Sequence, residues 1–476
     1  MFSASFMSKR SRILYLAALL LLAPSVARAQ RTLTLDEALA TAHRNNRDLK
    51  QAKARIAQAH AGVLTAWSAL LPIVSAQGKY THNYKEVTLD LTSQIQPTLT
   101  LTEGLRSLVM DGTPLANQLD QSIAGLNAAL MQPNPIIQKG EQLDFVAAAT
   151  VPLIVPWAYP ALSAAKRLED AGRANFDVSD AQVLFATAQA YYACAGADEL
   201  VDARRHAVVV AQKALDNAKA RLEAGVVNRV EVQRAELQLV RAQQALVESQ
   251  DTSAQTYRAL GTIMNMHEPV RVLPAEAPPP QPAPVDTLTA QALQLRPEFA
   301  VLQKTIESNK LTVESNWLRW LPALSAFGNV RAFNYAGFSG DKYSWAVGLQ
   351  LDWTLYDGGI RDAQRKLAAA QREENEAKID QLRDQVRDDV YNAERQLGTK
   401  RRALDTARRS VQLSQQTLDL VQVQHDAGTA TQLDLLQAQD NLVAAEVALA
   451  QARFDLALGG LQLDRLAGTF PANLKL

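Results

Sequence analysis

The chain has 476 residues, and its 49 basic and 49 acidic side chains cancel. Without an excess of positive charge it has no electrostatic attraction for a phosphate backbone, so we expect no nucleic-acid partner. Aromatic residues are scarce, and alanine, leucine, glutamine and arginine dominate the middle of the sequence. This composition favours long helices.

Residues 1–29 have the features of a signal peptide. A basic start precedes an apolar core at 13–22 that is too short to be a permanent membrane anchor, and Ala27-Arg28-Ala29 matches a cleavage site. The mature chain is therefore predicted to begin at Gln30. Cys194 is the only cysteine and is not at that site, so we expect a buried packing residue, no internal disulfide and no lipid anchor through cysteine.

A helix is predicted over 35–70, opening at Thr34 or Asp36 and ending before Pro72. The Trp-x-x-x-Leu-Pro ending recurs as Trp317 to Pro322 in the second half. No later stretch approaches the roughly 20 apolar residues of a membrane-spanning helix, which excludes a helical inner-membrane protein.

The segment 343–355 alternates strictly between apolar and polar residues. Its apolar face consists of Tyr343, Trp345, Val347, Leu349, Leu351, Trp353 and Leu355. Such alternation, with aromatic residues at both ends, is required of a lipid-facing barrel strand, although a half-buried strand of a soluble sheet alternates equally well. Segments 73–84, 143–155 and 323–335 show weaker versions of the pattern.

Four strands cannot close a membrane barrel, because small barrels begin at about 8 strands. Open sheet edges are not tolerated in lipid, so a barrel here must be shared between subunits. The strands thus predict an oligomer. The segment 85–141 between the first two strands is broken by prolines, and we expect a surface-exposed cap region with one helix around 115–130.

Helical patterns of about 65 residues follow each strand pair, at 159–223 and 361–426, and each would be roughly 100 Å long. In the second pattern an apolar residue recurs every seven positions, which predicts a coiled coil with charged flanks. The recurring residues are Val390, Leu397, Leu404, Val411 and Leu418. Returning helices are expected over 229–264 and 432–466.

A glycine turn joins each long helix to its returning helix, at Gly225 and at Gly428. In both copies a carboxylate, Glu231 or Asp434, lies six residues after the glycine. These acids could stabilise the helix starts, because the helix dipole favours anions there, or they could form acidic rings that select cations in an oligomer. The two interpretations have similar weight.

The hairpins, strands and Leu-Pro corners occur twice, which predicts an internal duplication. We place a first structural repeat at 30–270, a proline-rich linker at 271–286 and a second repeat at 287–476.

Enzyme signals are absent. The six histidines show no metal-ligand spacing, and we expect no metal and no cofactor. Asp357-Gly358-Gly359 lies between a strand and a helix but lacks the Gly-Lys-Ser/Thr ending of a phosphate-binding loop, so a strand-to-helix corner is favoured.

The order of these parts resembles the TolC family of outer-membrane efflux proteins. The motifs that carry the resemblance are Arg221-x-x-Ala-Gly225-(x)9-Ala235, Ala427-Gly428-Thr429-(x)4-Asp434-Leu435-Leu436-x-Ala438 and Leu355-Tyr356-Asp357-Gly358-Gly359. It covers nearly all of the mature chain. The resemblance implies a mostly helical homotrimer of a Gram-negative outer membrane, with four strands per subunit in a shared twelve-stranded β-barrel and a coiled-coil helical tunnel in the periplasm.

The resemblance also implies passive conduction of exported substrates, without a cofactor. A periplasmic adaptor would dock on the hairpins and link the tunnel to an inner-membrane efflux or secretion pump, as in tripartite efflux or type I secretion. The docking residues would be Arg221, Gly225, Gly428, Ala235 and Ala438. The gate at the periplasmic tip would include Asp434, Gln437, Glu231, Thr429 and His425, and the lipid-facing strand Trp345, Val347, Leu349, Leu351 and Trp353.

The tip departs from TolC at three positions. Gln437 replaces a second acid, Ala430 replaces an arginine and His425 replaces a tyrosine, so the polar lock near the gate cannot be carried over. His425 could make the tip pH-sensitive, although a surface histidine is the favoured interpretation.

Two other classes compete with a channel. A soluble periplasmic coiled-coil scaffold or adaptor would share the heptads, the glycine turns and the signal peptide, but it would not leave the apolar face from Trp345 to Trp353 in water. An exported hydrolase would require a convergent catalytic cluster, which the sequence does not show.

Overall fold

The computed structural model describes residues 31–134, 136–273, 284–334 and 341–470. The predicted signal peptide and most of the proline-rich linker lie outside the described residues. The chain divides into two compact units. The first comprises Met1–Ala59, Leu168–Ile306 and Glu373–Leu476, and the second His60–Arg167 and Glu307–Arg372.

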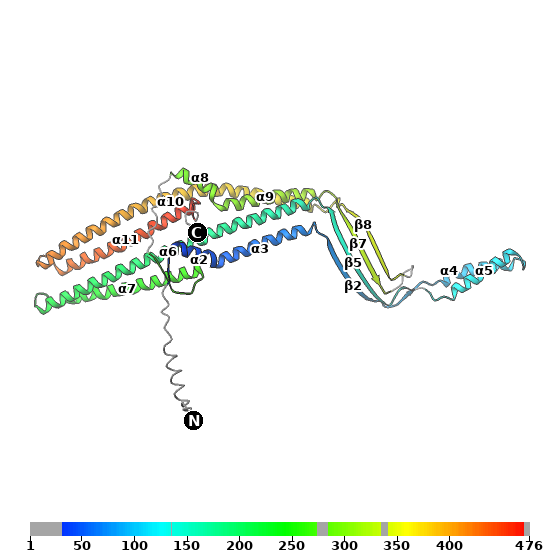
Figure 1. Ribbon diagram of the computed structural model, residues 1–476, viewed down its shortest axis with the longest axis horizontal. Helices are drawn as coiled ribbons and strands as arrows, with labels where there is room; N and C mark the ends of the chain where they lie inside the picture. The colour runs from blue at the N-terminus through cyan, green and yellow to red at the C-terminus, as the bar shows by residue number, and fades with distance from the viewer. Residues whose placement is uncertain (1–30, 135, 274–283, 335–340, 471–476) are drawn as a thin grey trace, which may run out of the picture. The chain divides into compact units, whose positions relative to one another are not determined.

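Helices dominate the described residues (Figure 1). The helices are α2 (Leu35–Asn45), α3 (Arg47–Ser68), α4 (Thr92–Ser107), α5 (Pro114–Leu130), α6 (Ala158–Glu223), α7 (Arg229–Met264), α8 (Val285–Leu295), α9 (Pro297–Leu318), α10 (Ile360–Asp426) and α11 (Gln432–Leu466). The strands are β1 (Arg31–Leu33), β2 (Ile73–His82), β3 (Val87–Thr88), β4 (Ile136–Gln138), β5 (Glu141–Ile154), β6 (Val270–Val272), β7 (Ala323–Phe333) and β8 (Tyr343–Asp352).

The four long helices agree with the sequence prediction to within one residue at each end. The heptad seam of α10 is buried where it begins, with Val390, Leu397 and Leu404 at 0%, 3% and 7% exposure. Val390 and Leu397 pack with α8, α9 and α11 in one apolar cluster, which explains why a narrow stripe suffices to hold so charged a helix.

The single helix predicted over 35–70 is wrong, because the chain breaks at Asn46 into α2 and α3. The buried Asn46 side chain accepts hydrogen bonds from the backbone N–H groups of Asp48 and Leu49, and it donates to the carbonyl of Ile263. The side chain therefore caps α3 while it fastens α7 beside the break. Thr34 and Glu37 form a capping box that starts α2.

A small parallel sheet, β1 with β6, anchors the core of the first unit. The hydroxyl oxygen of buried Tyr191 on α6 lies 3.0 Å from the carbonyl of Leu33 and 2.8 Å from that of Leu273. Cys194, one turn further along α6, is buried in the same cluster, as predicted. Burial raises the pKa of its thiol to about 12, so this cysteine is an inert packing residue.

The second unit is organised around an antiparallel sheet in the order β2-β5-β7-β8 (Figure 1). The register places one apolar set of residues on a single face across all four strands. That face contains Val74, Ala76, Gly78 and Tyr80 on β2, Leu143, Phe145, Ala147, Ala149 and Val151 on β5, Leu324, Ala326, Gly328, Val330 and Ala332 on β7, and Tyr343, Trp345, Val347, Leu349 and Leu351 on β8. The opposite face carries Lys79, Asp144 and Arg331, and Arg331 pairs with Asp144.

The corner at Asp357 agrees with the prediction of a strand-to-helix turn. Gly358 and Gly359 have φ of 72° and 90°, and the Asp357 carboxylate accepts hydrogen bonds from the backbone N–H groups of Gly359 and Arg361. Its oxygen is also 2.8 Å from Nε of Arg361, whose guanidinium stacks 4.0 Å from the ring centre of Trp320. These contacts cap the start of α10.

The segment between β2 and β5 contains two helices rather than the single one predicted. α5 matches the expectation, but α4 was missed. Pro97 and four threonines lower the helix propensity of α4, and its packing on α5 compensates. No helix within the described residues has an apolar stretch of the length and hydropathy needed to cross a membrane.

Candidate functional site

The two helix-to-helix turns of the first unit have the same geometry. At the end of α6 the N–H of Gly225 donates to the carbonyl of Leu222, and the N–H of Val226 donates to that of Arg221. At the end of α10 Gly428 and Thr429 make the equivalent bonds to His425 and Gln424. Both glycines have positive φ, 71° and 78°, and a Cβ added at either would meet no atom within 4 Å. Glycine is thus required here for backbone conformation rather than for space.

Asp434 takes part in the start of α11. The Thr431 hydroxyl accepts from the N–H of Asp434, and the Asp434 carboxylate accepts from the N–H and the hydroxyl of Thr431 at 2.9 and 2.7 Å. This capping box holds the pKa of the exposed Asp434 carboxyl below its usual range, mainly through the Thr431 side chain. Asp434 therefore has a local role in helix capping, whether or not it also acts in a ring.

The first-half equivalent is capped differently. The side chain of Asn228 accepts a hydrogen bond from the N–H of Glu231, which lies in the first turn of α7. The Glu231 side chain is half-buried, whereas Asp434 is exposed. The two hairpin carboxylates therefore occupy different environments although they occupy the same sequence position in each turn.

His425 is buried, so its interpretation as a surface histidine is wrong. Only 5% of the residue is exposed, and the Arg221 guanidinium of α6 contacts ring atom Nε2. The same guanidinium nitrogen lies 3.4 Å from ring atom Nδ1, and Nδ1 is 3.6 Å from a carboxylate oxygen of Asp426. His425 lies seven residues after Leu418, so the heptad seam of α10 contained the signal for its burial.

Further polar contacts join the two hairpins along their length. Gln238 on α7 donates to Asp440 on α11. His206 and Glu199 on α6 lie 3.8 Å from Glu446 and Arg453 on α11. The Glu199–Arg453 pair is exposed and contributes little to stability, whereas His425 contacts the half-buried Arg221 from a buried position near the turns.

The remaining predicted tip and docking residues fall into two groups. Gly225, Gly428, Thr429 and Gln437 are exposed around the turns. Ala235 and Ala438 are 0% and 4% exposed, because they pack inside the helical hairpins, Ala235 against Ala211, Leu215 and Ala218. Their side chains hold the hairpins together and are not available for direct contact with a partner.

The apolar face of the four-stranded sheet is exposed. Trp345, Val347 and Leu349 on β8 are 68%, 72% and 68% exposed, and Val74 on β2 is 76% exposed. The outer edges of β2 and β8 have no strand partner among the described residues. A continuous apolar surface with unpaired backbone groups at both ends is a liability in water and requires a covering environment.

Among the described residues, no three His, Cys, Asp or Glu side chains gather as metal ligands would.

An amphipathic antiparallel sheet joined to paired, very long helical hairpins defines the class of outer-membrane channel proteins with helical extensions. The sequence model of the family described as outer membrane efflux protein matches residues 148–266 and 288–469 of this chain. The chain belongs to this family of outer-membrane efflux channels, the TolC family, whose members are not enzymes.

Individual relatives agree with the family assignment. The chain is 24% identical over 318 residues to the outer membrane efflux protein BepC of Brucella suis. The aligned region covers 66% of this chain and 69% of BepC. A membrane protein from Pseudomonas aeruginosa has the same fold, with a TM-score of 0.71, 17% identity and coverage of 92% and 91%. The CmeC outer membrane channel of Campylobacter jejuni matches with a TM-score of 0.67, 16% identity and coverage of 91% and 85%.

Proposed function

We propose that three copies of this chain form one channel in a Gram-negative outer membrane, with β2, β5, β7 and β8 of each copy contributing to a shared twelve-stranded barrel. The observation that carries the proposal is the exposed apolar face shared by all four strands, bounded by the unpaired edges of β2 and β8. In a closed barrel β8 of one copy would pair with β2 of the next, and lipid would cover the apolar face. The polar face with Lys79, Asp144 and Arg331 would line a wet lumen.

The helical hairpins would extend this barrel into the periplasm as a tunnel that conducts exported substrates passively. A periplasmic adaptor would dock on the exposed turns around Gly225 and Gly428 and couple the tunnel to an inner-membrane efflux or secretion pump. The two backbone hydrogen bonds that both glycine turns share support an internal duplication, with repeats at 30–270 and 287–476 joined by the linker at 271–286.

The Arg221–His425 contact is the proposed latch of the tip. It joins α6 to α10, so an outward movement of one hairpin away from the other would break it. The exposed carboxylates of Asp434 would face their copies in the trimer and favour cations at the periplasmic entrance.

Fractionation and mass measurement test the proposal. We expect the mature protein in the outer-membrane fraction, with the mass of three chains in detergent and with ion conductance in planar bilayers. Release by osmotic shock as a monomer would contradict the channel and favour a soluble scaffold, which the exposed face from Trp345 to Trp353 argues against.

A further inference from the structure

The segment between β2 and β5 folds as a helical hairpin of its own, attached to the sheet through the two-stranded β3–β4 ribbon (Figure 1). Its two helices pack along seams with alternating spacings of three and four residues, as in an antiparallel coiled coil. The seam residues are Ile95, Leu99, Thr102 and Arg106 on α4, Val109 in the turn, and Ala116, Leu119, Ile123, Leu126 and Leu130 on α5, all of them buried or half-buried.

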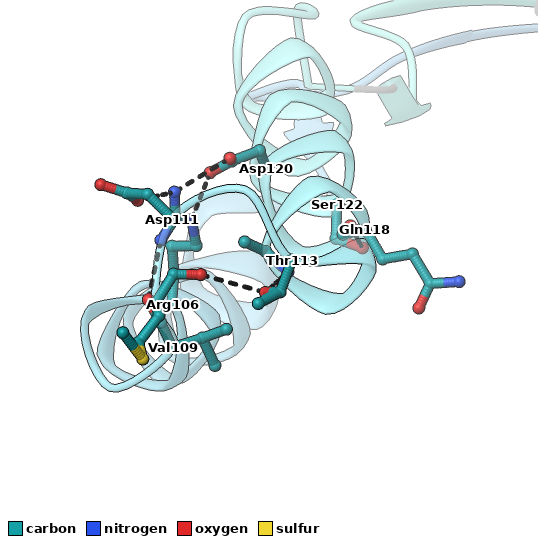
Figure 2. A network of polar contacts seen from close by, with 9 residues as sticks. Arg106, Val109, Asp111, Thr113, Gln118, Asp120 and Ser122 are labelled. Carbon is teal, nitrogen blue, oxygen red and sulfur yellow. Dashed lines mark hydrogen bonds and ion pairs between the residues drawn. The ribbon is translucent and has the colours of Figure 1, made fainter.

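Arg106 fixes the pairing of these two helices. Figure 2 shows its guanidinium between the carboxylates of Asp120 on α5 and Asp111 in the connecting turn, with N–O distances of 2.7 and 2.8 Å. The same guanidinium donates to the carbonyl of Val109. A charged residue in a coiled-coil seam specifies register, because any slip would leave it unpaired. The hairpin is therefore built as a defined module rather than a loose loop.

No other described segment of the chain packs against the opposite face of α4. A shallow apolar groove runs along it, lined by Pro97, Thr100, Leu101, Gly104, Leu105 and Leu108. Leu101 and Leu108 are 66% and 83% exposed, and a Cβ at Gly104 would meet nothing within 4 Å. Small residues at Thr100 and Gly104 between leucines leave room for another helix to approach closely.

The charge pattern indicates what covers this groove. The charged residues of 92–130 are Glu103, Arg106, Asp111 and Asp120, and Arg106 is paired with both aspartates in the hairpin. The groove itself has no charge to attract an anionic lipid headgroup or a charged protein. A contact around a symmetry axis brings each residue close to its own copies, where like charges would repel, so an uncharged face is suited to self-association.

We propose that the α4 helices of three copies pack together through the Pro97–Leu108 groove and form a lid over the outer end of the channel. This inference rests on the proposed trimer. The hairpin leaves the sheet from β2, the edge strand that would pair with the next copy, so it emerges beside the subunit boundary. The lid would be held by apolar contacts and opened by passing substrate.

Site-specific disulfide formation tests the lid. In a Cys194→Ala background, Leu101→Cys and Leu108→Cys each place one thiol on the groove, while Gln121→Cys, on the exposed face of α5, is the matched control. We expect oxidation of intact cells to convert up to about two thirds of the groove variants into covalent dimers, because three thiols around an axis leave one unpaired. The Gln121→Cys protein should stay monomeric on denaturing gels.

Two results would overturn the lid. Groove thiols that do not cross-link but react with a membrane-impermeant maleimide as fast as Gln121→Cys would show a face left in water. Thiols that neither cross-link nor react would show another occupant. The mass of the same samples in detergent separates this inference from the proposed function: a trimer without cross-links overturns only the lid, whereas a monomer overturns both.

Discussion

The guanidinium of Arg221 contacts the imidazole of His425 where α6 and α10 end, and His425 is almost completely buried there. Further along, the two hairpins are joined by the Gln238–Asp440 hydrogen bond and by the His206–Glu446 and Glu199–Arg453 pairs.

A double-mutant cycle should reveal this coupling. We expect Arg221→Ala and His425→Ala each to lower the free energy of unfolding by about 1–3 kcal/mol, because each leaves a polar group without its partner. The double variant should lose less unfolding free energy than the two single variants added together, and the difference, the coupling energy, should be about 1 kcal/mol. Denaturant unfolding in detergent measures it. The exposed pair Glu199 and Arg453 is the control and should show almost no coupling. Additive effects at Arg221 and His425 would rule out the latch.

The glycine of the second turn should be sensitive to substitution. Gly428→Ala forces a side chain into positive φ and should destabilise the protein by about 1–2 kcal/mol. Gly398→Ala, inside α10 and also without atoms near its Cβ position, should stabilise it by up to about 1 kcal/mol. The change in thermal unfolding temperature of each variant relative to the wild type measures both effects. Equal effects at both positions would mean that the turn conformation is not what requires glycine.

The Asp434 capping box should make the start of α11 sensitive to acid. Because the Asp434 pKa is lower in the folded state than in the unfolded state, its contribution is present above about pH 4 and is lost as the pH falls through the folded value. We expect amide hydrogen exchange in the first turn of α11, corrected for intrinsic rates, to accelerate between about pH 4 and pH 2. Asp434→Asn should abolish this acceleration of exchange at low pH, and so should Thr431→Val. If the acceleration at low pH persists in both variants, the capping box is excluded as its cause.

Conductance separates the capping role of Asp434 from an acidic ring. We expect Asp434→Asn to reduce the cation preference of single channels, since it removes one negative charge per copy at the entrance. Thr431→Val keeps the charge and removes the cap, so its cation preference should equal that of the wild type. The ring hypothesis is lost if Asp434→Asn leaves ion selectivity unchanged.

Val347 and Ala346, which are adjacent on β8 but lie on opposite faces of the sheet, should differ in their tolerance of a charged substitution. Val347→Arg places a cation on the apolar face and should destabilise the inserted protein by about 2–4 kcal/mol if it lies near the membrane midplane. Ala346→Arg places the same group on the polar face and should be tolerated. The yield of detergent-stable trimer measures both. Equal tolerance at the two positions would argue against lipid on the apolar face.

Sequence patterns located the strands of the large sheet and the four long helices. The period of two located the strands and the heptad repeat marked α10 as a coiled-coil helix, because each period alone determines which face of a strand or helix is apolar. Glycines that end helices located both turns. In contrast, α4 and the break at Asn46 escaped prediction, because tertiary partners outweigh local propensity there: α5 stabilises a proline-containing helix, and Ile263 fixes the side chain that interrupts an alanine-rich one.

The sequence by itself thus determined the long helices and the amphipathic strands, since hydrophobic periodicity is a local property of the residues. Only the tertiary structure decided how the tip is held. It showed that His425 is buried against Arg221 and that Ala235 and Ala438 face inward. These facts depend on which residues from distant parts of the chain meet. The heptad repeat places His425 in the buried seam of α10, but it does not specify that Arg221 of α6 is the residue it contacts.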